Sequence, residues 1–184
     1  TITGNFNITS EGSRRLYGYS RPHGHSSLEL YFWIGGNGMS ARYLPEGLPI
    51  PIPENDNLSK PYWDGLMQER LMVQRCKGCN TWIWGPEWIC HACHSFEIDW
   101  QEIDGKGQIY SWERPWHPVH SALKGFGPYL IVLVELPHVG NIRMIGNLLG
   151  SPEQEVEIGA HVEIAFEHHL DTDPPHTLAQ WKLI

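Results

Sequence analysis

The sequence lacks long apolar runs and is poor in basic residues. No apolar stretch approaches the roughly 20 residues that a membrane-spanning helix needs. The opening segment, TITGNFNITS, has neither the basic part nor the apolar part of a secretory signal. Thirteen Lys and Arg oppose 21 Asp and Glu, which gives a formal net charge of −8 at pH 7. We therefore expect a cytoplasmic protein with no membrane partner and, because an acidic surface repels phosphates, no nucleic-acid partner.

Size and cysteine content narrow the class of protein. A chain of 184 residues, 41% of them hydrophobic, can bury one compact core, with room for one small additional module. It contains only four cysteines. In a reducing compartment, cysteines that occur close together bind metals more often than they form disulfides.

Residues 1–38 differ in composition from the rest of the chain. They are rich in Gly, Ser, Tyr and His and show no clear hydrophobic period. The stretch HSSLELYFWIGGNGM resembles either the linker of a purification tag or a translated ribosome-binding sequence. We interpret 1–38 as a non-native or disordered extension and Met39 as the native first residue, with a genuine N-terminal extension as the alternative. From Met39 onward, ten Lys and Arg oppose nineteen Asp and Glu, so the acidic character remains.

A proline-rich segment and a helix come next. Residues 45–55 (PEGLPIPIPEN) contain four prolines, which favours an extended arm. The following NLSKPYWDGLMQERL has apolar residues at helical spacing, with Asn57 or Ser59 as the cap and Pro61 in the first turn. We expect a helix of about three turns over 60–71. We expect the arm and this helix to lie outside both small cores and to dock on a larger protein.

After Cys93 the pattern changes to strands. The runs are short, rich in β-branched and aromatic residues, and separated by Gly, Pro, Asn or Asp. They cover 97–103, 107–115, 129–136, 141–149, 161–166 and 178–184. The run 129–136 (YLIVLVEL) predicts a strand buried on both faces, while Asp104-Gly105 and 138–141 predict hairpin turns. We expect a mainly β chain that ends in a five-stranded closed barrel.

The most specific pattern is a pair of CxxC motifs, Cys76 to Cys79 and Cys90 to Cys93, separated by ten residues. Two such knuckles can present four thiolates to one tetrahedral zinc ion. We expect Gly78 to supply a positive φ in the first knuckle, and 81–89 to form a hairpin that turns at Gly85-Pro86. Iron, two disulfides and a redox role are the alternatives. His91 and His94 could replace a thiolate, but four sulfurs already saturate the ion, which indicates structural rather than catalytic zinc.

Catalytic and cofactor-binding candidates are few. No serine occupies a GxSxG motif, and all the cysteines are expected on metal. His117 and His120, with Glu113 nearby, are the best proton-transfer candidates, although loop histidines more often face solvent or a partner. The cluster at 168–173 predicts a solvated turn more than a weak metal site. The cations available for the phosphates of a thioester cofactor are Lys124, Arg114 and Arg143.

The nine tryptophans exceed what a small barrel can bury. Trp82, Trp84 and Trp88 crowd the cysteine segment, and Trp112 and Trp116 flank the loop that carries the histidine pair. Exposed aromatic anchors are typical of protein interfaces. The alternative for Trp82 and Trp84 is that they only cover the zinc ribbon.

The order of these motifs resembles a known family. PYWDGL, RCKGC with CHAC, IYSW, PYLIVLVEL, IRMIGNLLG and IGAHVEIAF occur in the order found in the zinc-ribbon/OB-fold acyl-CoA-associated family, over roughly 45–184. The resemblance implies an N-terminal helix, a rubredoxin-like four-cysteine zinc ribbon and a C-terminal five-stranded OB-fold barrel. It divides the chain into a Pro-rich arm and helix (39–71), a zinc ribbon (72–98) and an OB-fold (99–184). Members of this family accompany thiolase-like enzymes.

A finer resemblance concerns function. LPIPIPENDNLSKPYWDGL, RPWHPVH and IRMIGNLLG resemble small subunits of bacterial C-acyltransferases that act on acylated phenolics of the acylphloroglucinol kind, in secondary metabolism. This implies a non-catalytic scaffold that bridges thiolase-like and ketosynthase-like subunits and that could contact an acyl thioester. The alternatives are a single-stranded nucleic-acid-binding OB-fold module and a stand-alone acyl-CoA-binding protein or thioesterase. The expected partner or substrate-channel contacts are Trp63, Trp84, Trp112, Trp116, His117, His120 and Lys124.

Overall fold

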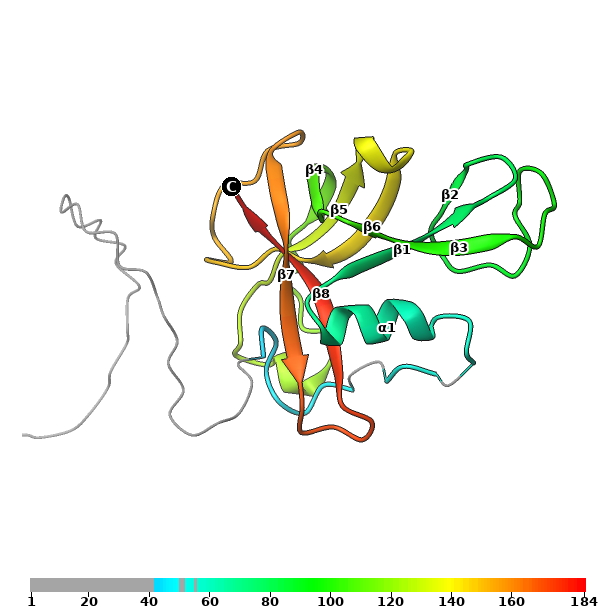
Figure 1. Ribbon diagram of the computed structural model, residues 1–184. Coiled ribbons are helices and arrows are strands. Elements are labelled where there is room, and N and C mark those ends of the chain that lie inside the picture. The colour runs from blue at the N-terminus through cyan, green and yellow to red at the C-terminus, as the bar shows by residue number, and fades with distance from the viewer. Residues whose placement is uncertain (1–41, 50–51, 55) are drawn as a thin grey trace, which may run out of the picture. The chain divides into compact units, whose positions relative to one another are not determined.

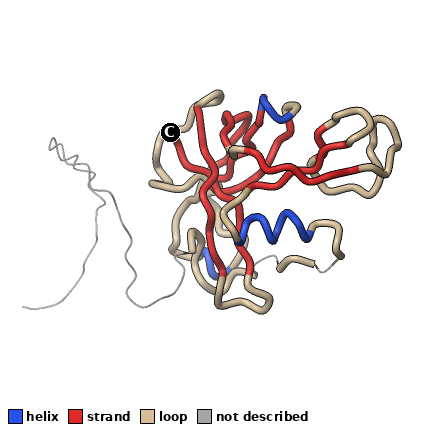
Figure 2. Tube along the Cα trace, viewed as in Figure 1, coloured by secondary structure: helices blue, strands red, loops and turns tan. Residues whose placement is uncertain are grey.

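The computed structural model describes residues 42–49, 52–54 and 56–184 (Figure 1). The expectations for 1–38 and Met39 lie outside these residues. Strands dominate the described part (Figure 2). Within it α1 is the only α-helix, and η1 and η2 are short 3-10 helices. Among these residues we find no helix with the length and apolar character needed to cross a membrane. The elements are α1 (Lys60–Met67), β1 (Leu71–Cys76), β2 (Trp82–Ile83), β3 (Ile98–Ile103), β4 (Lys106–Glu113), η1 (Ser121–Leu123), β5 (Ile131–Leu136), η2 (Pro137–Val139), β6 (Ile142–Asn147), β7 (His161–His169) and β8 (His176–Leu183).

The first sheet holds the cysteine segment. Its three strands are ordered β2-β1-β3, and β3 pairs along the whole of β1, from Leu71 opposite Ile103 to Cys76 opposite Ile98. Because β3 pairs with β1 and β4 pairs elsewhere, the prediction of a hairpin turn at Asp104-Gly105 was wrong. Gly105 instead carries the chain from one sheet to the next at φ +65°, where a Cβ would stand 2.4 Å from Ile164 Cγ2.

The second sheet is the predicted barrel. Its five antiparallel strands are ordered β6-β5-β4-β7-β8 (Figure 1). A parallel bridge between Leu148 and Trp181 brings the two end strands together, and the Leu149 N–H donates to the Trp181 carbonyl over 2.7 Å. The barrel is therefore nearly closed and OB-like, which confirms the mainly β fold with a five-stranded barrel. The turn expected at 138–141 does join β5 to β6, with Gly140 in the left-handed region.

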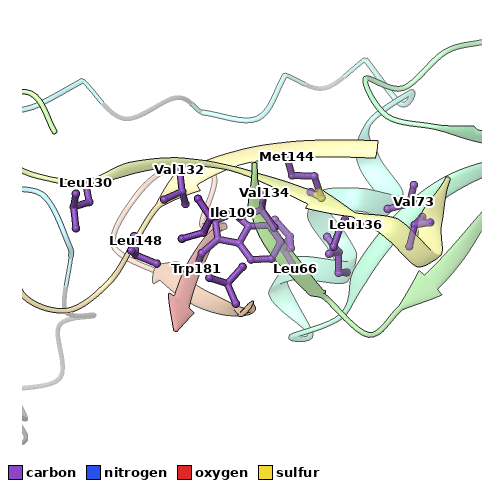
Figure 3. Close-up of a cluster of buried hydrophobic side chains, with 13 residues drawn as sticks. Leu66, Val73, Ile109, Leu130, Val132, Val134, Leu136, Met144, Leu148 and Trp181 are labelled. Carbon is purple, nitrogen blue, oxygen red and sulfur yellow. The ribbon is translucent and has the colours of Figure 1, made fainter. Parts of the chain in front are cut away.

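The barrel core centres on Trp181, which is fully buried together with Ile109, Val132 and Leu148 (Figure 3). Gly146 makes room for the indole, because a Cβ there would come within 2.8 Å of Trp181 Cδ1. Strand β5 alternates between fully buried and half-buried positions. The expectation of a strand buried on both faces was therefore wrong, since only one face of β5 lines the core.

The helix is shorter than predicted and belongs to the core. It ends at Met67, two residues before Glu69 takes a φ of 56°, so the chain reverses into β1 instead of adding a third turn. Leu66 is 0% exposed within the main core cluster. Ser59 occupies the N-cap position but makes no side-chain cap, because its hydroxyl donates to Asp56. The expectation that this helix lies outside both small cores was wrong, since packing on β1 and β8 covers its apolar face.

Candidate metal centre and surrounding surfaces

Two matching knuckles hold the four cysteines. In the first, the Asn80 N–H donates to the Cys76 carbonyl over 2.9 Å, and Asn80 has φ 62°. In the second, the His94 N–H donates to the Cys90 carbonyl over 2.8 Å, and His94 has φ 60°. Each CxxC is thus closed by a left-handed residue directly after its second cysteine. The same backbone turn occurs twice, which aims both cysteine pairs at one point.

This arrangement differs from the sequence prediction in two details. The positive φ lies at Asn80 and His94 and not at Gly78, which is absent from the positive-φ glycines of the described chain. The predicted hairpin within 81–89 does not form, because β2 pairs with β1, with Trp82 opposite Arg75. The first knuckle is itself the turn of that hairpin, so cysteine spacing and strand pairing are set together.

The sulfur geometry fits a tetrahedral ion. All four sulfurs lie within 4.8 Å of one another; Cys76 and Cys93 are 3.5 Å apart, and Cys79 and Cys90 are 3.6 Å apart. Four sulfurs at about 2.3 Å from one zinc ion would be about 3.8 Å apart. Cys76 and Cys90 are buried, while Cys79 and Cys93 are exposed. A thiolate set this compact fits structural zinc and leaves no position for water or substrate.

The electrostatics of the four thiols show why a cation belongs there. Hydrogen bonding to the Thr81 hydroxyl, with smaller contributions from the Thr81 backbone and Cys93, lowers the pKa of Cys79 to about 6. A hydrogen bond from the Ser95 backbone lowers the pKa of Cys93. The hydrogen bonds with the other three sulfurs together outweigh this effect and raise the pKa to about 12. Contact between the sulfurs thus shifts the pKa values of Cys79 and Cys93 in opposite directions, which opposes ionisation of Cys93. A divalent ion removes this conflict because it stabilises every thiolate at once.

The tryptophans expected at interfaces divide into two groups. Trp63 and Trp84 are half-buried and form an edge-to-face cluster around Tyr62, with ring centroids 5.1 Å from it. Burial raises the pKa of the Tyr62 hydroxyl. Both tryptophans pack against the main core, so most of their surface is used within the chain. Trp112 and Trp116 are exposed, and the Arg114 guanidinium lies over the Trp112 ring, 5.3 Å from its centroid.

Two further groups of exposed apolar side chains stand out. Trp88, Ile89 and Phe96 flank the second knuckle, and Phe96 is 75% exposed; we call this group the ribbon patch. Trp116, Val119 and Phe126 lie between β4 and β5, and Val119 is 79% exposed; we call this group the loop patch. Several large exposed apolar side chains within one short segment favour a protein interaction site.

The predicted histidine pair and cations occupy different environments. His117 is exposed, whereas half-buried His120 caps η1, its Nδ1 accepting from the Ala122 N–H over 3.2 Å. Arg114 donates to the Gln154 carbonyl, and Arg143 pairs with Glu135 at 2.9 Å. Lys124 is exposed next to η1. Two of the three cations expected to meet phosphates are therefore bonded to their own chain.

The cluster at 168–173 includes the surface turn that the sequence predicted, because residues 170–173 form a largely exposed turn between β7 and β8, but His169 does not share its exposure. His169 is buried at the end of β7, and Asp171 pairs with Arg42 at 2.6 Å, which holds the pKa of that carboxyl below its usual range. In the described chain, the four cysteines are the only set of His, Cys, Asp or Glu residues that could hold a metal. The sequence analysis missed Glu167, which is buried beside His169 with its Oε1 3.0 Å from His169 Nε2. The sequence did contain a trace of Glu167, because polar residues recur at alternate positions of β7 and β8. Such alternation usually marks a face exposed to solvent, so it did not indicate a buried carboxylate.

Taken together, the knuckles, the three-stranded sheet and the nearly closed barrel define a zinc-ribbon/OB-fold protein. Comparison with family models agrees: residues 63–99 match the ChsH2 rubredoxin-like zinc ribbon domain, and 100–167 match the ChsH2 C-terminal OB-fold domain. A chain of the solved structure described as the Ltp2-ChsH2(DUF35) aldolase is 34% identical, with a TM-score of 0.59, over 73% of this chain and 98% of that chain. This chain belongs to the ChsH2 (DUF35) family.

Two other similarities were found. A protein of Thermomonospora curvata, described as a probable enoyl-CoA hydratase alpha subunit, is 37% identical over 131 residues, which are 71% of this chain. The match spans only 38% of that protein's length. A DUF35-family protein of unknown function from Sulfolobus solfataricus is 16% identical, with a TM-score of 0.48, over 70% of this chain and 87% of that chain.

Proposed function

We propose that this chain is a non-catalytic, zinc-binding subunit of a cytoplasmic multicomponent C-acyltransferase. It bridges a thiolase-like and a ketosynthase-like subunit, which carry the nucleophile and the base. The substrates are acylated phenolics of the acylphloroglucinol kind. One observation carries the bridging role: the chain has two separate exposed apolar groups, the ribbon patch beside the zinc site and the loop patch between β4 and β5.

The location of the two patches supports a role in binding proteins. The ribbon patch lies on a segment that a zinc ion bound by the four clustered cysteines would hold in place. The loop patch adjoins η1, whose backbone is held by His120 and by the Leu123 N–H to His120 carbonyl bond of 3.0 Å. Apolar side chains on ordered segments lose little conformational freedom on binding, which favours tight complexes. The solved relative is described by two component names, Ltp2 and ChsH2, which supports the existence of a partner.

The same surfaces suggest how far the chain takes part in chemistry. Trp112, Trp116, His117 and Lys124 lie at or near the loop patch, so we propose that this end of the barrel faces the partner's substrate channel. There Lys124 could meet an acyl thioester. His120 would support this surface from within, because it caps η1. Trp63 and Trp84 pack with Tyr62 against the main core, so we propose that they only help to shape a partner contact.

Copurification with the thiolase-like and ketosynthase-like proteins of the same source tests the bridging role. We expect Trp88→Ser combined with Phe96→Ser to weaken binding of one partner at least tenfold, and Trp116→Ser combined with Phe126→Ser to weaken binding of the other. The matched control is Ile158→Ser, which replaces an exposed isoleucine outside both patches. Partner binding that survives both double substitutions contradicts the bridging role.

Activity assays test the reaction. The reconstituted complex should transfer an acyl group to an acylphloroglucinol, and the isolated chain should not. The similarity to the probable enoyl-CoA hydratase alpha subunit of Thermomonospora curvata favours a second candidate function, that of a subunit of an enoyl-CoA hydratase. Hydration of an enoyl-CoA by the complex, without acyl transfer, would replace the first reaction by the second. Acyl transfer by the isolated chain would overturn the non-catalytic role.

A further inference from the structure

A cavity of about 390 Å³ lies between the described arm segment 42–49, the loop at Val119 and His120, and one face of β7 and β8. Its walls are apolar and consist of leucines and prolines of the arm together with Val119 and Leu178. The volume is within the range of small-molecule sites, which combine apolar walls with a few placed polar groups. The arm is part of this site and is fixed to the barrel by the Arg42–Asp171 ion pair of 2.6 Å.

The floor of the cavity is polar and ordered. Glu167 Oε2 accepts from Gln180 Nε2 over 2.7 Å, and Glu167 Oε1 accepts from the Tyr43 N–H over 3.1 Å. Gln180 Oε1 in turn accepts from the Asn147 N–H over 2.6 Å. Glu167 and Gln180 are both buried. This network satisfies the carboxylate from within the chain, so Glu167 does not need a ligand.

His169, which also lines the cavity, is different. Its side chain is 2% exposed, and neither ring nitrogen has an aligned hydrogen-bond partner among the described residues. The Glu167 carboxylate lies 3.0 Å from Nε2 but outside hydrogen-bonding alignment. The ring is stacked on His176, with centroids 5.2 Å apart and an interplanar angle of 10°, so it is not free to turn toward another acceptor. Buried polar groups without partners in the protein are rare and commonly mark a ligand or water position.

The charges around the cavity limit the kind of ligand. Arg42 is already paired with Asp171, and Glu167 carries negative charge at the floor, so a carboxylate or phosphate would be repelled. Burial lowers the pKa of His169 below its ordinary value, with the Glu167 charge opposing, so the ring is neutral at neutral pH. A neutral imidazole offers one N–H and one lone pair. Because the Glu167 carboxylate lies 3.0 Å from Nε2, the proton belongs on that nitrogen and the lone pair on Nδ1. A ligand hydroxyl that donates its proton matches this lone pair.

We propose that this cavity binds a small uncharged phenol, whose ring lies against the leucine and proline walls and whose hydroxyl hydrogen-bonds to His169. A phenol is favoured over an aliphatic alcohol because its hydroxyl is the stronger donor and its flat ring is rigid. The proposal depends on the cavity alone and not on the subunit role, and the two are tested separately.

Calorimetric titration of the full chain with 4-ethylphenol tests this site. The comparison ligand is 4-ethylanisole, which has the same ring but cannot donate a hydrogen bond. We expect saturable binding of 4-ethylphenol and at least tenfold weaker binding of 4-ethylanisole. Equal affinities for the two ligands would overturn recognition by His169, and absence of saturable binding would overturn the site.

Three variants locate the ligand. Leu48→Trp fills the cavity and should abolish binding, whereas the matched Ile52→Trp, on an exposed position of the same arm outside the cavity, should leave it unchanged. His169→Phe keeps a flat ring, removes the unpartnered nitrogens, and should reduce affinity for 4-ethylphenol to that for 4-ethylanisole. If His169→Phe does not fold by circular dichroism, the two tryptophan variants decide, since both change a segment outside the strands. Equal loss of binding in Leu48→Trp and Ile52→Trp would overturn the proposal.

Discussion

Removal of the metal should unfold the ribbon tip and leave the barrel intact. The tip has a separate small core in which only Cys76, Ile83 and Cys90 are buried, with Ile98 packed against them. Full burial of an isoleucine contributes about 1.5–3 kcal/mol. Structural zinc in small finger peptides contributes an apparent 10–16 kcal/mol at about pH 7. Trp82 and Trp84 also pack against the main core, so the ion supplies most of the free energy that orders the two other parts of the tip, 77–80 and 85–97.

Hydrogen exchange monitored by mass spectrometry is the suitable assay, because it reports each segment separately. After zinc is removed from the full chain with a chelator, we expect amides in 77–80 and 85–97 to exchange at least a hundredfold faster. Amides in β4 to β8 should keep their protection, because the barrel core is centred on Trp181, away from the small core of the tip. Return of zinc should restore slow exchange.

Two variants serve as controls. Cys90→Ser removes a buried ligand and should lower the zinc content and increase exchange in the same segments. His91→Ala removes an exposed side chain of the same knuckle, which pairs with Glu87 at 3.0 Å, and should keep one zinc per chain. Unchanged exchange in 77–80 and 85–97 after complete loss of metal would refute the reasoning, as would equal loss of protection throughout the barrel.

Two further predictions concern stability. Leu66→Ala should lower the free energy of unfolding by about 2–5 kcal/mol, because it opens a cavity in the main core. Met67→Ala, at a position 37% exposed, should lower it by less than about 1 kcal/mol. Urea denaturation measures both changes, and equal effects would contradict the packing of α1. Burial lowers the pKa of His169, so the unfolded chain binds the extra proton near pH 6.5 while the folded chain does not. The free energy of unfolding should therefore fall as the pH drops below about 6.5, and His169→Phe should remove this part of the slope in urea titrations between pH 5.5 and 7.5. The charged groups around His169 that remain in that variant are Glu167, His176 and Arg42. An unchanged slope would show that His169 is protonated equally in both states.

The metal site and the strands could be predicted because their signals are local. Two CxxC motifs ten residues apart need only a turn at each pair to bring four sulfurs together, so spacing alone indicates the centre. The position of the left-handed residue could not be predicted in the same way. Gly78 has the greatest conformational freedom, yet the hydrogen bond from the Asn80 N–H to the Cys76 carbonyl places the positive φ at Asn80.

The buried polar floor was beyond sequence analysis because it depends on distant parts of the chain. Glu167 accepts a hydrogen bond from the backbone of Tyr43, 124 positions away. Without the arm, the alternating polar residues of β7 and β8 would face solvent, as their pattern suggests. The length of the helix was misjudged for a similar reason. Helical spacing of apolar residues continues to Arg70, but the chain has already reversed there, and the Arg70 carbonyl and the Met72 side chain lie close against Gly65.

The shared core of the ribbon and the barrel has a mechanical consequence. Leu71 and Val73 at the start of β1 are buried in the same cluster as Trp181, while the other end of β1 carries Cys76. One strand thus links the barrel interior to the metal site, so the ribbon cannot move freely relative to the barrel. If each patch holds a different protein, capture of the first would present the second at a set spacing and raise its effective concentration. In such an assembly this chain would serve as a spacer of fixed length.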